Sequence, residues 1–262
     1  MSPVEGVVLF VASAIASGIN SVAGGGSLIS YPLITTFMGP GFANLGPGYE
    51  KMANATNSVG LFPGSLAGGI GFGKSNLSKT GVYFRKLLIP TILGSIGGGY
   101  LLLMTPQTVF KVVIPFLILL ASLLLWFQPK VKAMLVKSDH QVISPWFGMV
   151  LQFLVAVYGG YFGAGMGIMM LASFALYMNG TTHELNAVKS WLGTIINLTC
   201  SIVFLVKGLV VLSFAWILVV GSIVGGFAAA RMSLKVDPDK MRTVIAIYGF
   251  IMTIYFFTKI FS

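Results

Sequence analysis

Long apolar runs separated by short polar or basic stretches make up most of this chain. An α-helix needs about 20 apolar residues to cross the hydrocarbon core of a bilayer. Segments 27–38 and 167–179 are too short for a comfortable crossing, and each is the second apolar segment of its half of the chain. In all, the pattern predicts ten apolar helical segments, at roughly residues 4–23, 27–38, 52–73, 86–104, 107–127, 145–163, 167–179, 187–206, 209–230 and 241–260.

The two halves of the chain share short motifs in the same order. "AGGGS" from Ala23 aligns with "AGMGI" from Ala164, and "NATNS" from Asn54 aligns with "NAVKS" from Asn186. "GSIGGGY" aligns with "GSIVGGF", and the proline that opens the fifth segment aligns with Pro238. Four matches in order indicate an internal duplication. We therefore expect an N-terminal transmembrane repeat at residues 1–127, a cytoplasmic basic linker at 128–144 and a C-terminal transmembrane repeat at 145–262.

Composition narrows the class of protein. Of the 262 residues, 56% are hydrophobic and only 8% are charged, whereas a soluble globular domain carries about 25% charged residues. The chain is therefore expected to be an all-α polytopic membrane protein. The single cysteine, Cys200, excludes an intramolecular disulfide. The N-terminus lacks the basic region of a cleavable signal.

The basic residues predict an orientation. Five segments in each half place the three most basic loops on one side, which the positive-inside rule makes cytoplasmic. Equivalent loops have opposite charge bias, as two inverted repeats would show: the loop after the third segment is basic, but its counterpart has only Lys207. Both termini are then expected outside the plasma membrane. If each glycine cluster makes a re-entrant hairpin, eight crossings remain and this orientation is unchanged. The basic residues are Lys74, Lys79, Arg85, Lys86, Lys130, Lys132, Lys137, Arg231, Lys235, Lys240 and Arg242.

Both short segments follow glycine clusters, in "NSVAGGGSLISYP" and "YFGAGMGIMMLASF". Irregular backbone at membrane depth is tolerated only where it is buried in protein or lines a water-filled cavity. Broken helices at matching positions of two inverted halves are typical of a transporter's binding site. The helix N-termini that begin at a break favour an anion, and Ser27 would add a hydroxyl. We expect the breaks to form a two-sided anion site; the alternative is that glycine only allows close helix packing.

A second polar group begins the third and eighth segments. Asn54, Asn57 and Ser58 share one helical face. Amides and hydroxyls can donate hydrogen bonds to an oxyanion, and an ionisable residue inside a span is a functional candidate by default. The alternatives are that the first asparagine of each group caps its helix and that the lysine snorkels to the membrane interface. The matching residues of the eighth segment are Asn186, Lys189 and Ser190.

These features predict a substrate site without a metal or a cofactor. The two histidines lie outside the apolar segments, so the chain is not expected to be an enzyme. No aspartate or glutamate lies inside a long segment, which favours coupling to the membrane potential or to a proton carried on the substrate. The predicted substrate-binding residues are Gly24, Gly25, Gly26, Ser27, Asn54, Asn57, Ser58, Gly165, Gly167, Asn186, Lys189 and Ser190.

The run "GGGSLISYPL", followed by "ANATNSVGLFPGSLAG" and a degenerate second copy, resembles the TauE/SafE sulfite exporter family over nearly the whole chain. The resemblance implies a plasma-membrane transporter for a small sulfur-containing anion such as sulfite, thiosulfate or an organosulfonate. The second copy departs from the first at Met166 and Ile168, so the two glycine breaks need not contribute equally to binding the anion. The residues that the resemblance implicates are Gly24, Gly25, Gly26, Ser27, Asn54 and Asn57, and more loosely Gly163, Gly165 and Gly167.

We expect the anion to bind near the membrane midplane and to be moved by alternating access of the two repeats. A transporter or channel for a cation or a neutral small solute would share the architecture, and this alternative stays open. The net charge of +10 belongs mainly to the loops, and no nucleic-acid partner is expected. The expected partners are the anion and the lipid bilayer, and the sequence leaves a homodimer open.

Overall fold

The computed structural model describes residues 2–22, 24–39, 48–136, 144–178, 180–232 and 238–261. Within these ranges the chain forms ten α-helices and no strand, which confirms the predicted all-helical fold. The residues named above that lie outside the described ranges are Ala23, Lys137, Asn179 as the end of a segment, and Lys235. The helices are α1 (Pro3–Val22), α2 (Ser27–Met38), α3 (Tyr49–Gly71), α4 (Lys74–Met104), α5 (Gln107–Val136), α6 (Pro145–Tyr161), α7 (Met166–Tyr177), α8 (Thr182–Val206), α9 (Leu212–Met232) and α10 (Pro238–Phe261).

Several helices extend beyond the apolar segments that predicted them. α4 begins at Lys74 and α5 continues to Val136. Lysine, arginine and leucine are good helix formers, so a helix does not end where its most apolar part ends. Within the part of the chain that the structure describes, six helices are long and apolar enough to cross a membrane: α1, α4, α5, α8, α9 and α10. α2 and α7 are short, with 12 residues each, as the sequence predicts.

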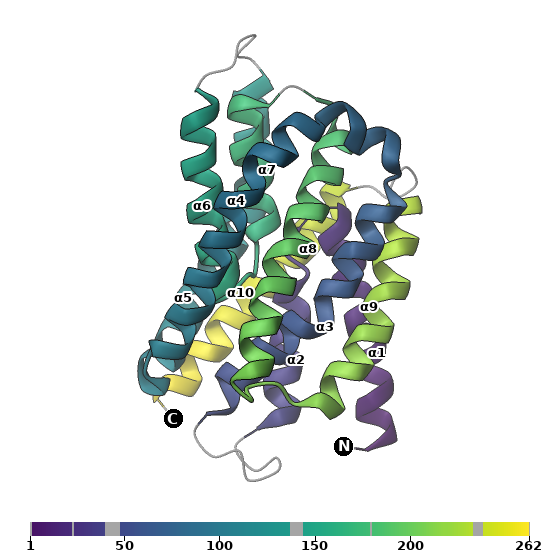
Figure 1. The fold of residues 1–262 in the computed structure, drawn as a ribbon. Helices are drawn as coiled ribbons and strands as arrows, with labels where there is room; N and C mark the ends of the chain where they lie inside the picture. The colour runs from purple at the N-terminus through teal and green to yellow at the C-terminus, as the bar shows by residue number, and fades with distance from the viewer. Residues whose placement is uncertain are drawn as a thin grey trace.

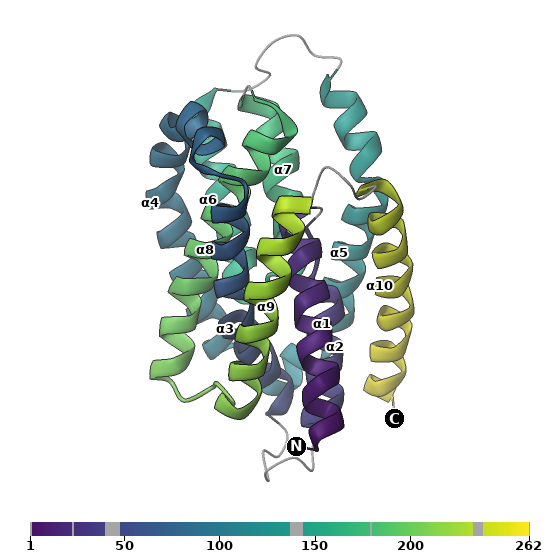
Figure 2. The ribbon, with the colours of Figure 1, turned by 90° about the vertical axis from the view of Figure 1, so that its right-hand side faces the viewer.

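The helices lie side by side in a bundle, and both termini are at the same end (Figures 1 and 2). α2 turns back toward the end at which α1 begins. α7 turns back toward the opposite end, at which α6 begins (Figures 1 and 2). Each glycine break therefore joins two helices into a hairpin.

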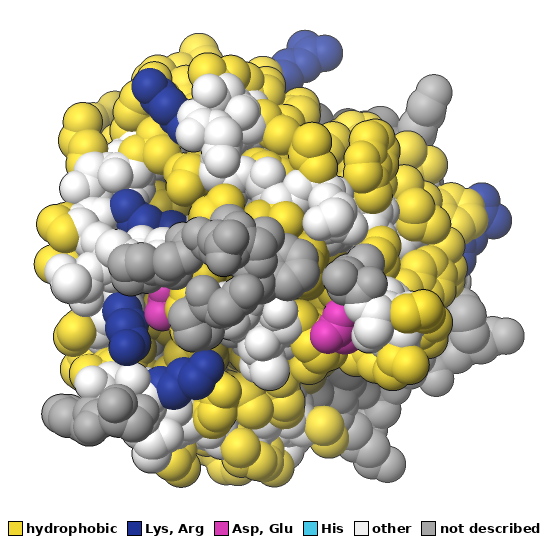
Figure 3. All heavy atoms as spheres, turned by 90° about the horizontal axis from the view of Figure 1, so that it is seen from below, with side chains coloured by type: hydrophobic (Ala, Val, Ile, Leu, Met, Phe, Trp, Pro, Cys, Tyr) yellow, Lys and Arg dark blue, Asp and Glu magenta, His cyan; other side chains and the backbone are white. Residues whose placement is uncertain are grey.

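The outer surface of the bundle is apolar. Large hydrophobic side chains are exposed on several helices, among them Ile89, Phe116, Trp216 and Ile254. Soluble proteins rarely expose large contiguous apolar surfaces. Viewed from the end that holds both termini, hydrophobic atoms dominate the rim and charged side chains are sparse (Figure 3). This distribution suits a bundle surrounded by lipid.

Small residues allow the helices to approach closely. α1 packs against α9, and α4 packs against α6. A Cβ atom at Gly225 of α9 would overlap the carbonyl group of Ala14 on α1, and one at Gly98 of α4 would overlap that of Val157 on α6. The glycine-rich stretches "GSIGGGY" and "GSIVGGF" are therefore helix-packing surfaces. α3 and α8 also pack against each other.

Candidate functional site

The two glycine breaks have closely similar local geometry. The amide of Gly24 donates to the carbonyl of Ile19 at 3.0 Å, and the amide of Gly163 donates to that of Tyr158 at 3.2 Å. Both glycines adopt left-handed backbone angles, with φ of 81° and 79°, which glycine reaches without steric cost. The hydrogen bonds therefore pair Gly24 with Gly163, a different register from the sequence alignment of Ala23 with Ala164.

The two breaks touch each other at the centre of the bundle. A Cβ atom at Gly24 would lie 3.0 Å from the amide nitrogen of Ile168, and one at Gly167 would lie 3.3 Å from the Cα of Gly24. A Cβ at Gly167 would also lie 3.3 Å from Cδ of Lys189, so the lysine stem crosses the second break. Glycine at these positions lets the backbones of the two halves meet.

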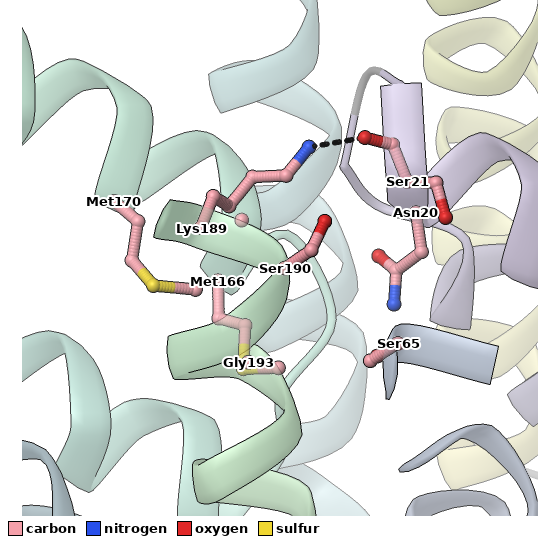
Figure 4. Close-up of a pocket in the computed structure, with 9 residues that line it drawn as sticks. Asn20, Ser21, Ser65, Met166, Met170, Lys189, Ser190 and Gly193 are labelled. Carbon is pink, nitrogen blue, oxygen red and sulfur yellow. Dashed lines mark hydrogen bonds between the residues drawn. The ribbon is translucent and has the colours of Figure 1, made fainter. Parts of the chain in front are cut away.

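A small cavity lies beside this contact, between α1, α3, α7 and α8 (Figure 4). Its internal space of about 20 Å³ is enough for roughly one water molecule. Polar groups from α1 and α3 lie on one side of the cavity, and two methionines from α7 lie on the other (Figure 4). The lining residues are Asn20, Ser21, Ser65, Met166, Gly167, Met170, Lys189, Ser190 and Gly193.

Lys189 is the charged residue of this cavity. Its side chain is only 2% exposed, and its ammonium group donates to the backbone carbonyl of Ser21 at 3.0 Å (Figure 4). That carbonyl belongs to the last turn of α1, where carbonyls lack intrahelical partners. The alternative that Lys189 snorkels to the interface is therefore wrong. The neighbouring Ser190 hydroxyl is buried and has no hydrogen-bond partner among the described residues.

Asn54 and Asn57 lie on the other side of the breaks, in the first half of α3. The Asn54 amide donates to the carbonyl of Tyr161, at the end of α6, at 3.0 Å. The Asn57 side-chain oxygen accepts a hydrogen bond of 2.6 Å from Ser30 on α2. Neither residue lines the cavity. Nor does Asn54 or Asn186 cap its helix, because α3 and α8 begin after Gly48 and Thr181.

The predicted site residues therefore divide into groups. Gly167, Lys189 and Ser190 line the cavity. Asn186 is close to them in sequence and buried, and its side-chain oxygen has no partner in the part of the chain that the structure describes. Ser58 donates to the carbonyl of Asn54 in its own helix. The remaining residues form the backbone of the breaks and do not line the cavity: Gly24, Gly25, Gly26, Ser27 and Gly165.

Sequence reasoning missed most of the cavity wall. Asn20 is a polar residue in the last turn of an apolar helix, which was a usable signal, and its side-chain oxygen accepts from the amide of Gly26 at 3.3 Å. Ser65 and Met170 carried no signal, because single serines and methionines are common in apolar helices. Only the packing of α3 and of α7 against α8 brings them to the cavity.

Among the described residues, two carboxylates are buried, and both lie at the beginning of a helix, outside the long apolar segments as the sequence predicts. Glu50 and Glu184 lie in the first turns of α3 and α8, and are 5% and 7% exposed. Glu50 accepts from the Gln107 amide at 2.9 Å, and Glu184 accepts from the backbone amide of Thr181 at 2.7 Å. Neither lines the cavity. The described residues include no group of three metal-ligating side chains.

The capping box at Thr181 orients the helix that carries Lys189. The Thr181 hydroxyl accepts from the amide of Glu184 at 3.3 Å, and the Glu184 carboxylate accepts in return. Thr181→Ala is expected to lower the free energy of unfolding by about 1 kcal/mol. Denaturant unfolding of the wild type and the variant in detergent measures this difference in the free energy of unfolding. Thr108→Ala, at an exposed position of α5, is the matched control, and an equal loss there would contradict the assignment.

Multiple apolar spans around two touching helix breaks, with a polar cavity beside them, define a polytopic membrane transporter. The family model described as sulfite exporter TauE/SafE matches residues 9–256, so the chain belongs to the TauE/SafE sulfite exporter family. This is a family of membrane transporters, which confirms the expectation that the chain is not an enzyme.

Three curated relatives are named as probable membrane transporter proteins. One from Haemophilus influenzae is 29% identical and aligns over 94% of this chain and 92% of its own length. The YfcA protein of Escherichia coli K12 is 26% identical over 97% of this chain and 90% of its own. The ORF9 protein of Sinorhizobium sp is 25% identical over 94% and 90%. No solved structure matches the chain.

Proposed function

We propose that this protein is a secondary transporter that moves a small sulfur-containing anion, such as sulfite, thiosulfate or an organosulfonate, across the plasma membrane. The family description and the transporter names of the relatives support this proposal. The anion binds beside the touching glycine breaks, where Lys189 and the neutral donors around it replace its hydration shell.

The observation that carries the proposal is the buried ammonium group of Lys189. A buried charge is costly unless it is paired, and none of the residues that line the cavity carries a carboxylate. The ammonium group is held by a backbone carbonyl, which is a weaker partner than a full negative charge. An anion that displaces this carbonyl completes the pairing. A buried cation at the same place opposes the binding of a cationic substrate.

Alternating access is supported by the way the helices pair. α1 packs on α9 as α6 packs on α4, while α3 pairs with α8 and α5 with α10. Such reciprocal pairing is expected of two inverted repeats that rock against each other. We assign the repeats to residues 1–127 and 145–262, with the basic linker at 128–144 between them.

The two sides of the breaks differ in a way that fits such a cycle. The cavity lies where α3 ends and α8 begins. On the other side, the Asn54 contact to Tyr161 and the Ser30 contact to Asn57 tie the two breaks to α3. Opening toward that side requires these contacts to separate. We place the end of the bundle opposite both termini, where α3, α5 and α9 end and α4, α6 and α10 begin (Figure 1), on the cytoplasmic side.

Flux measurements in proteoliposomes test the proposal. The purified protein is reconstituted, and the uptake of labelled sulfite, thiosulfate and methanesulfonate is compared with the uptake of rubidium under a fixed membrane potential. Saturable flux of at least one sulfur anion, accelerated by an inside-positive potential, is the expected result. Rubidium or neutral-solute flux without any anion flux would overturn it.

Ser190→Ala separates a binding role from a structural one. The Ser190 hydroxyl is buried and has no hydrogen-bond partner in the described ranges, so its removal is expected to leave the protein as stable as before or more stable by up to about 1 kcal/mol. Transport is expected to weaken, with KM raised by about 5- to 10-fold, because the anion loses a hydrogen-bond donor worth about 1 kcal/mol. A lower stability together with unchanged KM would contradict the role in binding.

A further inference from the structure

We infer that the cavity at Lys189 selects its substrate by charge: it accepts a singly charged anion and discriminates against a doubly charged anion of the same size. This inference rests on the proposed function, because it concerns the anion that the same site transports. It divides the sulfur anions into two groups that the family name does not separate.

The side chains that line the cavity carry a net charge of +1. Of the nine lining residues, Lys189 alone is charged, and the other polar side chains are neutral: Asn20, Ser21, Ser65 and Ser190. The elements packed around the cavity are α1, α3, α7 and α8, and their lining residues include no arginine, histidine or second lysine. A monoanion at the ammonium group therefore makes the occupied site neutral.

The two carboxylates that are buried among the described residues lie outside the cavity wall, so they do not change the charge of the lining. Glu184, in the first turn of α8, accepts from the amide of Thr181 and belongs to the capping box. Glu50, in the first turn of α3, is held by Gln107 of α5. Neither is among the lining residues.

A dianion would leave one negative charge uncompensated in a site that is buried from water. Lys189 is 2% exposed and Ser190 is 5% exposed, so solvent screens the excess charge weakly. Hydrogen bonds from neutral amides and hydroxyls stabilise an anion less than a second cation does. Burial of an unpaired charge is the larger cost. The dianion is therefore expected to bind more weakly than an isosteric monoanion.

The cavity can enlarge to admit such an anion. Its present space of about 20 Å³ holds roughly one water molecule, and the Lys189 ammonium is occupied by the Ser21 carbonyl. Met166 and Met170 form the opposite wall (Figure 4). Methionine side chains are unbranched and repack at low cost. When the anion enters, the Lys189 ammonium group therefore exchanges its hydrogen bond to the Ser21 carbonyl for an ion pair with the anion. The two methionine side chains change rotamer to make room.

Three probes of nearly equal size test the inference on the wild-type protein. Methanesulfonate and sulfamate each carry one negative charge at neutral pH, and sulfate carries two. Sulfamate has a polar group where methanesulfonate has a methyl group, so the pair separates charge from apolarity. Initial rates are measured in proteoliposomes with the membrane potential clamped at zero. We expect kcat/KM to be at least tenfold higher for both monoanions than for sulfate.

The possible results are distinct. Sulfate transport equal to or faster than that of the monoanions overturns charge selection but leaves the anion transporter in place. Fast methanesulfonate with slow sulfamate also overturns it, because apolarity would then decide. If neither these probes nor sulfite nor thiosulfate is transported at all, the proposed function itself is overturned. As a readout independent of turnover, methanesulfonate and sulfamate at low millimolar concentration are expected to raise the melting temperature of the wild type in detergent more than that of Lys189→Gln. Sodium sulfate is expected to shift both proteins equally, because its general stabilising effect does not need the site. A larger wild-type-specific rise with sulfate would count against the inference.

Discussion

Lys189→Gln is expected to reduce kcat/KM for the transported anion by about 10- to 150-fold. A hydrogen bond to a charged group contributes about 1.5–3 kcal/mol, and each 1.36 kcal/mol corresponds to a factor of ten. Glutamine can still donate to the Ser21 carbonyl but brings no positive charge. The folded protein is expected to be at least as stable as the wild type, because the variant removes a buried ion whose partner among the described residues is a backbone carbonyl and not a carboxylate. Flux and thermal unfolding are measured on the same preparation.

Two variants make this result specific to the site. Lys207→Gln, at the end of the same helix, removes an exposed lysine and is expected to leave the flux unchanged. Lys189→Arg keeps the charge and is expected to retain more activity than Lys189→Gln, although the larger guanidinium fits the cavity poorly. Normal flux through well-folded Lys189→Gln protein would remove Lys189 from the binding site.

Gly26→Ala is expected to prevent formation of the native fold. The Cβ atom of an alanine here would overlap the carbonyl group of Ala16, which belongs to the backbone of α1. The backbone of Gly26 is in the ordinary helical region, with φ of −56°, so the cost comes from contact rather than from backbone strain. A backbone carbonyl inside a helix cannot rotate away, and α1 and α2 must separate. We expect a loss of about 3 kcal/mol or more.

Gly97→Ala is the matched control for this substitution. Gly97 is an exposed glycine within α4, and nothing lies within 4 Å of an added Cβ atom. Alanine there is expected to be neutral or to stabilise the protein by about 0.5–1 kcal/mol. Size-exclusion chromatography and thermal unfolding in detergent distinguish the two variants. Folded, monodisperse Gly26→Ala protein of normal stability would show that α1 and α2 do not pack as described.

The prediction of the cavity from sequence succeeded only in part, and the reason lies in the helix breaks. The clusters "AGGGS" and "AGMGI" were visible because glycine is a strong local signal. The residues that hold the breaks in place were harder to assign, since Asn54 and Lys189 both reach across to the carbonyl end of a helix from the other half. Asn54 donates a hydrogen bond to the backbone carbonyl of Tyr161 away from the cavity, whereas Lys189 donates to that of Ser21 inside it. No local pattern distinguishes these two outcomes.

The sequence by itself determined the membrane class, the ten helical segments and the position of both breaks. These follow from composition, from the length of apolar runs and from glycine, all of which act locally. The tertiary structure alone decided which side chains meet at the cavity, as Asn20, Ser65 and Met170 illustrate. Lipid tails are as apolar as leucine, so a membrane helix is apolar toward lipid and toward protein alike. Hydrophobic periodicity therefore cannot specify which face of each helix turns inward, and only packing between helices does.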